Sequence, residues 1–287
     1  MCYLVIHSFQ NTNDGGKRNF RAKSALLIGS LDTCLLEKKI MAIASDHALA
    51  KSAATLAGKL LLTLREEANE AGLPPKRIGE IGDERSHKLL CAFLSDAFPS
   101  DAILSEEQMD DLERLEAERV WIIDPLDGTR EFSENGRNDW AVHVALVESQ
   151  EPTVGAVALP SLNATFCSDT KTTLTDSITD VRIVCSRTRP GPAAELLARE
   201  LSGDLIYMGS AGAKAMAVVR GDAEIYAHTG GQYEWDSCAP VAVAVASGLH
   251  ASRLDGSPLK YNQRDTYLPD LLICRKELAE ATLAILN

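Results

Sequence analysis

The chain has 287 residues, 45% of them hydrophobic and 24% charged, which is close to the average for globular proteins. This composition excludes a mainly disordered, collagenous or membrane-embedded protein, and the length suits one large domain or two smaller ones. The 41 acidic residues outnumber the 29 basic ones, and the resulting net charge of -12 makes binding to nucleic acid unfavourable.

Residues 1–40 differ in pattern from the rest of the chain. Polar residues and glycines at 11–16 interrupt short apolar fragments that have no sustained period, so we expect a loosely attached, poorly ordered extension. Met41 stands where regular patterning begins, which makes it a candidate for the physical start of the protein. Beyond it we expect an α+β domain at 41–175 and an α/β domain at 176–287.

Apolar spacing predicts two helices after Met41. The first should begin at Ser45 or Asp46, which can cap it, and end before Gly72 and the two prolines at 74–75. The second is predicted from about Asp83 to Phe98. The buried face of the first helix is predicted from residues three or four positions apart: Leu49, Ala53, Leu56, Leu60 and Leu64.

Short apolar runs predict strands at 102–104 and 120–123, with a charged, solvent-exposed helix at 108–119 between them. Runs at 140–147 and 154–159 are close enough to form a β-hairpin, which indicates α+β layering rather than a purely parallel, doubly wound sheet. After a polar stretch at 168–180, short strands and helices alternate. We expect strands at 181–185, 205–208, 223–227 and 271–274, and helices at 193–201, 213–220, 240–247 and 276–286.

The sequence Asp124-Pro125-Leu126-Asp127-Gly128-Thr129 directly follows a predicted buried strand. Two carboxylates delivered by a strand into a turn suit a hard cation such as Mg²⁺, which prefers oxygen ligands. If the next segment begins a helix, the free amides at its start favour a phosphate. The hexapeptide therefore predicts a site for a cation and a phosphorylated ligand.

Two further acidic motifs accompany the hexapeptide. Glu106 and Glu107 end the strand signal at 103–104, and neighbouring strands that end in carboxylates would bring them to one sheet edge. Taken alone, this pair favours a solvated loop. Asp236 follows Trp235 and precedes a run of small residues, where it looks like a helix N-cap.

Seven cysteines, an odd number, are scattered without a Cys-x-x-Cys pair, so we expect a reducing, cytoplasmic location. No apolar run approaches the roughly 18 residues that a membrane span requires, and no signal peptide is evident. Two histidines stand out. His143 lies inside an apolar strand, where we expect a core residue, whereas His228 precedes a Gly-Gly pair and is a candidate for lining a pocket.

Together the acidic pair, the hexapeptide and Trp235-Asp236 resemble the signature of the inositol monophosphatase-like superfamily of metal-dependent phosphatases, which has these motifs in this order. The resemblance runs from about Ser45 to the C-terminus and implies a layered α+β / α/β fold, an α-β-α-β-α sandwich. Further segments look like the CysQ branch of the superfamily: Arg130-Glu131-Phe132, Ser186-Arg187, Gly209-Ser210 with Lys214, and 255–259.

The resemblance also implies roles for individual residues. The ligands of two or three Mg²⁺ ions would be Glu106, Asp124, the carbonyl of Leu126, Asp127 and Asp236. Thr129 would help to activate water, with Asp83 as its partner, although Glu80 stands where the family usually has a threonine. The substrate would contact Gly128, Thr129, Arg130, Ser186, Arg187, Ser210 and Lys214, the basic residues Arg187 and Lys214 lying near a second phosphate or the ribose. Segment 229–234 differs from many relatives.

CysQ-type enzymes are 3'(2'),5'-bisphosphate nucleotidases. The resemblance therefore implies Mg²⁺-dependent hydrolysis of 3'-phosphoadenosine 5'-phosphate to AMP and phosphate during sulfate assimilation, together with inhibition by Li⁺ and a possible homodimer. The bound cations would let a protein of charge -12 hold an anionic nucleotide. Inositol monophosphate and fructose 1,6-bisphosphate are alternative substrates for the same site.

Two other functional classes fit less well. A haloacid-dehalogenase-type phosphatase needs Asp-x-Asp near the N-terminus, whereas Asp124 and Asp127 lie three positions apart in the middle of the chain. A module that only binds a phosphorylated ligand would not need Thr129 to activate water. Phosphate release from the three candidate substrates, with and without Mg²⁺, distinguishes these classes.

Overall fold

The structure is a computed structural model that describes residues 45–172 and 178–287. The predicted extension at 1–40 and the candidate start at Met41 lie outside the described residues. Among the residues described, no helix has both the length and the apolar character to cross a membrane.

Two long helices open the described chain, as predicted. Helix α2 (Asp46–Glu70) is capped by Ser45, whose hydroxyl accepts a hydrogen bond from the Ala48 amide at 3.3 Å. Helix α3 (Pro75–Ala97) begins about two turns before the predicted start near Asp83. Pro75 does not simply end α2: it occupies the first turn of α3, where a missing amide hydrogen costs nothing.

The predicted buried face of α2 was partly wrong. Leu56 is 45% exposed, while the buried side chains of α2 are mostly alanines that the leucine spacing did not select. Small residues let α2 approach the sheet closely: a Cβ at Gly58 would lie 2.7 Å from Pro160 Cγ. Small side chains therefore make up most of the buried face of α2, together with Leu49 and Leu61.

The first sheet contains five strands, β1 (Ala102–Ser105), β2 (Arg119–Asp127), β3 (Ala141–Glu148), β4 (Glu151–Leu159) and β5 (Ala164–Cys167), in the order β1-β2-β3-β4-β5. Strands β1 and β2 are parallel, and the other neighbours are antiparallel, which confirms the predicted hairpin of β3 and β4. A short 3-10 helix, η2 (Pro160–Leu162), joins β4 to β5.

The charged stretch at 108–119 is not the predicted solvent-exposed helix. It contains only one 3-10 turn, η1 (Glu113–Glu116), because Asp110 and Asp111 accept hydrogen bonds from the amides two residues ahead and Leu112 has a left-handed φ of 67°. Arg114 is buried, pairing with Asp110 at 2.8 Å and donating to the Gln263 carbonyl at 2.8 Å. The charges in this stretch therefore anchor a loop of the second half.

The second sheet contains β6 (Arg182–Ser186), β7 (Asp204–Met208), β8 (Ile225–Tyr233), β9 (His250–Ser252) and β10 (Tyr267–Cys274), in the order β7-β6-β8-β10-β9. Four helices accompany it: α5 (Pro192–Glu200), α6 (Ala211–Arg220), α7 (Glu234–Ala246) and α8 (Lys276–Leu286). Most of these elements were predicted; β9 and β5 were missed because both are very short. The strands of the first sheet all precede residue 175, and those of the second sheet all follow it. The predicted domain boundary at 175 stays a prediction.

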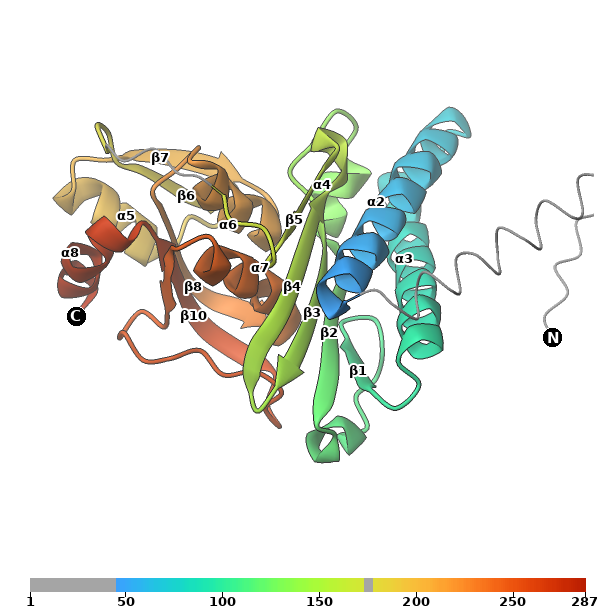
Figure 1. Ribbon diagram of the computed structural model, residues 1–287. Helices are drawn as coiled ribbons and strands as arrows, with labels where there is room; N and C mark the ends of the chain where they lie inside the picture. The colour runs from blue at the N-terminus through green and yellow to red at the C-terminus, as the bar shows by residue number, and fades with distance from the viewer. Residues whose placement is uncertain (1–44, 173–177) are drawn as a thin grey trace, which may run out of the picture. The chain divides into compact units, whose positions relative to one another are not determined.

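The elements form five layers, which Figure 1 shows from right to left. Helices α2 and α3 cover one face of the first sheet, α6 and α7 lie between the two sheets, and α5 and α8 cover the outer face of the second sheet. Apolar side chains fill each of the spaces between layers. The predicted α-β-α-β-α sandwich is confirmed.

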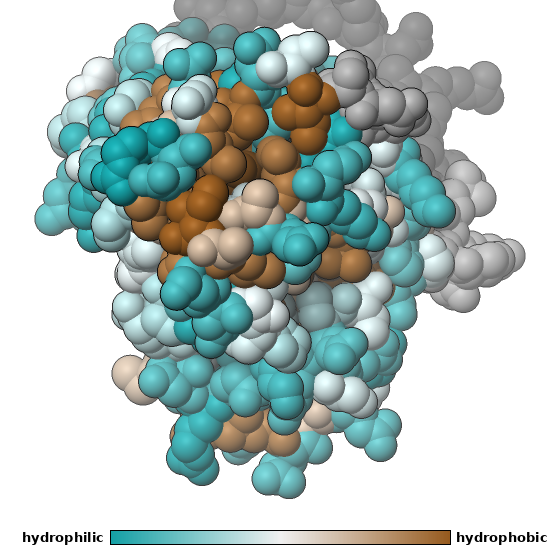
Figure 2. Space-filling view, turned by 90° about the vertical axis from the view of Figure 1, so that its left-hand side faces the viewer, coloured by the Kyte–Doolittle hydropathy of each residue, from teal (hydrophilic) through white to brown (hydrophobic). Residues whose placement is uncertain are grey.

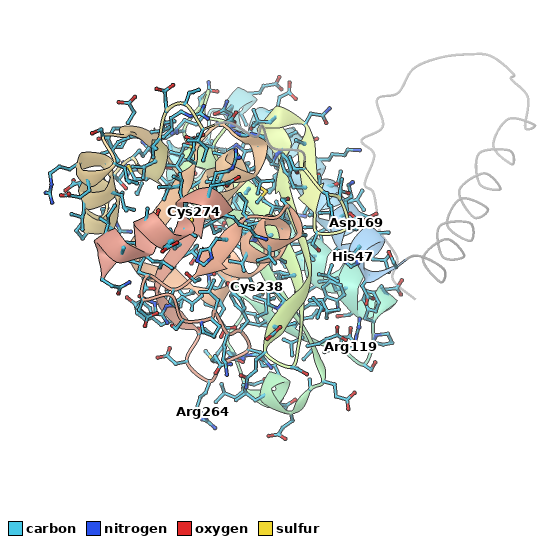
Figure 3. All side chains as sticks on the ribbon, turned by 60° about the vertical axis from the view of Figure 1, so that its left-hand side comes forward. His47, Arg119, Asp169, Cys238, Arg264 and Cys274 are labelled. Carbon is cyan, nitrogen blue, oxygen red and sulfur yellow. The ribbon has the colours of Figure 1, made fainter. Side chains whose placement is uncertain are left out.

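Figures 2 and 3 show the outer face of the molecule and the position of two buried cysteines. Figure 2 views the molecule from the side of α5 and α8, where apolar side chains gather over part of the face and hydrophilic ones surround them. Buried Cys238 and Cys274, labelled in Figure 3, belong to α7 and β10, and both are free thiols. Within the described ranges the other cysteines are free as well.

Candidate functional site

Strand β2 carries the hexapeptide at its C-terminal end. Pairing of β2 with β3 shifts register between Asp124 and Asp127, where Pro125 has no amide hydrogen to donate. The Pro125 carbonyl instead accepts a hydrogen bond from Ser86 of α3 at 2.6 Å, and Asp124 Oδ1 accepts one from the Leu126 amide at 3.1 Å. This irregular strand end brings the carboxylates of Asp124 and Asp127 close to that of Asp236 in α7.

Three carboxylates meet at this point. One oxygen each from Asp124, Asp127 and Asp236 lies within 4.8 Å of the others. Asp236 stands in the first turn of α7, where its Oδ2 accepts a hydrogen bond from the Tyr233 amide at 2.7 Å. The predicted N-cap position was wrong: Tyr233 is the N-cap residue, and Asp236, three residues later, completes the capping box. Glu106 follows β1, the parallel neighbour of β2, and its amide donates to the Ile123 carbonyl at 3.4 Å.

The crowded carboxyl groups resist ionisation. Burial, followed by repulsion from Asp236 and other acidic neighbours, raises the pKa of Glu106 to about 7. Burial and repulsion from Asp127 raise the pKa of Asp236 to about 7, and burial with repulsion from Glu106 raises that of Asp124 well above its usual range. A bound divalent cation would remove this penalty, so the oxygen donors present fit a hard metal ion.

Asp127 differs from its neighbours because cationic and amide groups surround it. Its two oxygens accept hydrogen bonds from the Ala211 amide at 3.1 Å and the Gly212 amide at 2.6 Å, at the start of α6. His143 Nε2 lies 3.2 Å from Asp127 Oδ2. Although burial alone would raise the pKa of Asp127, His143 and these amides hold it below its usual range. Asp127 therefore stays ionised within the cluster.

Thr129 and Asp83 lie together beside the cluster. Thr129 opens α4 (Thr129–Ser133), which confirms that a helix follows the hexapeptide, and Gly128 before it has a left-handed φ of 86°. The Thr129 hydroxyl lies 3.0 Å from Asp83 Oδ1 and 3.2 Å from the Leu126 carbonyl oxygen. Burial raises the pKa of Asp83 to about 7 despite this hydrogen bond. Glu80 pairs with Arg77 at 3.1 Å on the surface of α3, and its charge adds to the rise in the pKa of Asp83.

A cavity of about 490 Å³ opens next to Asp127 and Asp236. Five of the predicted substrate-contacting residues line it: Gly128, Arg130, Ser186, Ser210 and Lys214. Residues that the sequence did not single out for the substrate also line it, among them Arg189, Glu131 and Gln232, and His228 lines it as the sequence suggested. A cavity of about 630 Å³ elsewhere, near the turn between β3 and β4, contains none of the predicted site residues.

Two predicted basic residues have different surroundings. Lys214 is 4% exposed, and its Nζ donates to the carbonyls of Gly209 and Ser210, the latter at 2.8 Å. Arg187 is not among the residues lining the cavity; its guanidinium donates to Glu131 at 2.6 Å and to Glu134 at 2.7 Å. Arg187 therefore binds Glu131, which lines the cavity, but does not line the cavity itself.

Two residues of the surrounding framework were not recognised from the sequence. His143 is fully buried, as expected of a core residue, yet it touches Asp127 and its Nδ1 lies 3.0 Å from the Trp235 carbonyl oxygen. Asp139 accepts a hydrogen bond from the Gly209 amide at 2.6 Å and so fixes the loop that precedes α6. The only signal for His143 was a single polar residue in an apolar run, which cannot distinguish a core residue from one that supports a site.

The raised pKa values predict how stability depends on pH without metal. Folding shifts Glu106, Asp83 and Asp236 from the usual carboxyl pKa of about 4 to about 7. Between about pH 4 and pH 7 the folded protein then binds more protons than the unfolded chain, so its stability falls as pH rises. Melting temperatures of metal-free protein from pH 5 to 8 check this, with Asp236→Asn flattening the curve. A melting temperature that rises from pH 5 to 7 would contradict it.

Comparison with known proteins agrees with the geometry. The model of the inositol monophosphatase family matches residues 42–287. The 3'-phosphoadenosine 5'-phosphate phosphatase of Mycobacterium leprae is 49% identical over 256 residues, which cover 85% of this chain and 94% of that protein. Its Mycobacterium bovis counterpart is 51% identical over 232 residues, covering 78% and 86% of the two chains.

The solved structure of CysQ from Bacteroides thetaiotaomicron, a bacterial member of the inositol monophosphatase family, superposes with a TM-score of 0.66 at 26% identity. The superposition covers 82% of this chain and 98% of the CysQ chain. Phosphatases of this family are metal-dependent, in agreement with the acidic cluster. Because the family match spans all of the described residues, the chain belongs to the inositol monophosphatase family.

Proposed function

We propose that this protein hydrolyses the 3'-phosphate of 3'-phosphoadenosine 5'-phosphate, giving AMP and inorganic phosphate, with Mg²⁺ as cofactor. The observation that carries the proposal is the meeting of an acidic cluster and basic side chains at one cavity. Asp127 and Asp236 stand at its edge, and Arg130, Arg189 and Lys214 line it. The names of the mycobacterial relatives support the choice of substrate.

The ligands of Mg²⁺ would be Glu106, Asp124, Asp127, Asp236 and the Leu126 carbonyl. When bound, divalent cations would supply charge neutralisation for the phosphoryl oxygens and a lower pKa for the attacking water. Two or three ions per site suit the number of oxygen donors. Asp127, ionised and fixed by two amides and His143, would hold its side chain in one orientation throughout the reaction.

Thr129 and Asp83 would orient the attacking water and hold its proton. The Thr129 hydroxyl lies 3.0 Å from Asp83 Oδ1 and so can accept a hydrogen bond from water while donating its own to the carboxylate. An Asp83 pKa of about 7 suits a group that accepts a proton near neutral pH. We also place the reaction in sulfate assimilation, in the cytoplasm, and expect a homodimer.

Lys214 would recognise the second phosphate of the nucleotide. Replacing it with methionine keeps the side-chain volume and removes the charge, so we expect kcat/KM for the bisphosphate nucleotide to fall about 10- to 100-fold, the equivalent of one lost charge-assisted hydrogen bond. Hydrolysis of inositol 1-phosphate, which has no second phosphate, should change much less. Steady-state phosphate release from both substrates is the measurement.

Lys88→Met is the matched control, because Lys88 is exposed on α3 and pairs only with Glu84 among the described residues. An equal loss on both substrates would show that Lys214 supports the fold of the loop before α6 instead. An unchanged rate on both would remove Lys214 from the substrate site.

Substrate choice is tested by phosphate release from 3'-phosphoadenosine 5'-phosphate, inositol 1-phosphate and fructose 1,6-bisphosphate at saturating Mg²⁺. We expect the highest kcat/KM for the nucleotide. Equal values for the nucleotide and inositol 1-phosphate would replace the proposed nucleotidase by a phosphatase of broader specificity.

A further inference from the structure

Two hydrogen-bond acceptors in the cavity have no partner among the described residues. They are His228 Nε2 and Gln232 Oε1, both buried atoms of side chains that line the cavity. Gln232 is only 4% exposed. Buried polar atoms in folded proteins are nearly always hydrogen-bonded, so two lone acceptors on side chains that line one cavity point to a ligand that supplies the donors.

His228 is fixed as an acceptor by its surroundings. Its imidazole forms a hydrogen bond with the Gly230 backbone, and because Nε2 is without a partner in the described residues, that bond falls to Nδ1. Burial, with the nearby positive charges of Lys214 and Arg189, lowers the pKa of His228 to about 4. The ring is therefore neutral at physiological pH, with the lone pair on Nε2.

Gln232 is fixed in a similar way by Tyr226. Its Nε2 donates to the Tyr226 hydroxyl oxygen at 2.8 Å, which leaves Oε1 free to accept. Tyr226, His228 and Gln232 all belong to β8, and the Lys214 Nζ lies 5.4 Å from the centre of the Tyr226 ring. The acceptors and the buried lysine therefore form one polar group on the cavity wall.

We propose that His228 Nε2 and Gln232 Oε1 are specificity-determining acceptors that take hydrogen bonds from the N–H or O–H donors of the nucleoside part of the substrate. This inference rests on the proposed nucleotidase function. Phosphate oxygens cannot satisfy these two atoms, since both partners would be acceptors; phosphates are served by Lys214 and the arginines of the same cavity. The nucleoside part of 3'-phosphoadenosine 5'-phosphate has two donor groups, the 6-amino group of adenine and the 2'-hydroxyl.

Two substrate analogues distinguish these donors. The inosine analogue replaces the amino group with a carbonyl oxygen, and the 2'-deoxy analogue lacks the hydroxyl. We expect the wild-type kcat/KM to fall at least about 10-fold for the analogue that lacks the recognised donor, because a buried acceptor is then left without a partner. The analogue that loses rate identifies the donor, and a loss with both means that each acceptor takes one.

A pair of His228 variants tests the atom itself. Glutamine places its amide near the position of Nε2, whereas asparagine places it near Nδ1. His228→Asn should therefore lose about 10-fold in kcat/KM for the natural substrate and become insensitive to loss of the donor that His228 recognises, and His228→Gln should retain most of the wild-type rate and preference. Inositol 1-phosphate hydrolysis serves as the control for the metal cluster and should be the same in both variants.

Calorimetric titration with AMP, IMP and 2'-deoxy-AMP in the presence of Mg²⁺ gives a readout without turnover. The proposal is supported if the affinities show the same preference as the kcat/KM values of the analogues, and if His228→Asn loses that preference. Wild-type protein that binds the three monophosphates equally, and hydrolyses the natural bisphosphate and its two analogues equally, overturns it while leaving the proposed function intact. Failure to hydrolyse or bind any nucleotide, with inositol 1-phosphate still hydrolysed, overturns both.

Discussion

Asp127→Asn is expected to lower phosphate release by at least about 100-fold while the protein remains folded. Asparagine has nearly the same volume, and its oxygen can still accept one of the hydrogen bonds from the Ala211 and Gly212 amides at the start of α6. What it removes is a negative charge from the cluster of Asp124, Asp127 and Asp236, and with it one of the proposed metal ligands. Steady-state rates at saturating Mg²⁺ measure the loss.

Asp96→Asn is the control for this variant, because Asp96 is exposed near the end of α3, away from the cluster. It should have wild-type activity. Circular dichroism and thermal melting establish that both variants are folded. If Asp127→Asn kept more than about a tenth of the wild-type rate, Asp127 would not be a ligand on which the reaction depends.

Gly212→Ala is expected to reduce stability by about 1 to 3 kcal/mol, and to reduce activity as well, through overpacking at the proposed metal ligand. A Cβ at Gly212 would lie closer than 3.0 Å to His143 Nε2, so the imidazole or the start of α6 must move. Both groups contact Asp127, at 3.2 Å from His143 and 2.6 Å from the Gly212 amide. Denaturant unfolding and phosphate release measure the two effects.

The double variant Gly212→Ala/His143→Ala separates the clash from the loss of the imidazole. Removing the ring makes room for the added methyl group, so the destabilisation of the double variant should be smaller than the sum of the two single ones. Activity should stay low, because Asp127 has then lost the histidine. Additive destabilisation would mean that the methyl group at position 212 clashes with something other than His143.

The candidate site could largely be predicted from the sequence because several of its residues lie within one hexapeptide. Asp124 to Thr129 follow one buried strand, and the parallel pairing of β1 with β2 brings Glu106 to the same sheet edge. The fold was predictable for a related reason: apolar periodicity determines which elements form, and three ordered motifs select the family. Local sequence was sufficient to predict a site residue wherever the strand or helix that carries the residue also determines its orientation.

The residues that the sequence did not reveal depend on contacts between distant segments. Arg187 was expected at the substrate, but Glu131 and Glu134 of the α4 region bind its guanidinium, a pairing across more than 50 positions of the chain. Arg114 is buried rather than solvated because Asn262 and Gln263 meet it from the second half. His143 became part of the site only because α6 and α7 pack against β3.

Phosphate release from 3'-phosphoadenosine 5'-phosphate, followed through removal and return of Mg²⁺, tests the central claim most directly. Enzyme treated with a chelator should form no AMP above background, and added Mg²⁺ should restore equal amounts of AMP and inorganic phosphate, but not in Asp127→Asn. AMP formation that continues at an undiminished rate in excess chelator would contradict a catalytic metal centre at Asp124, Asp127 and Asp236.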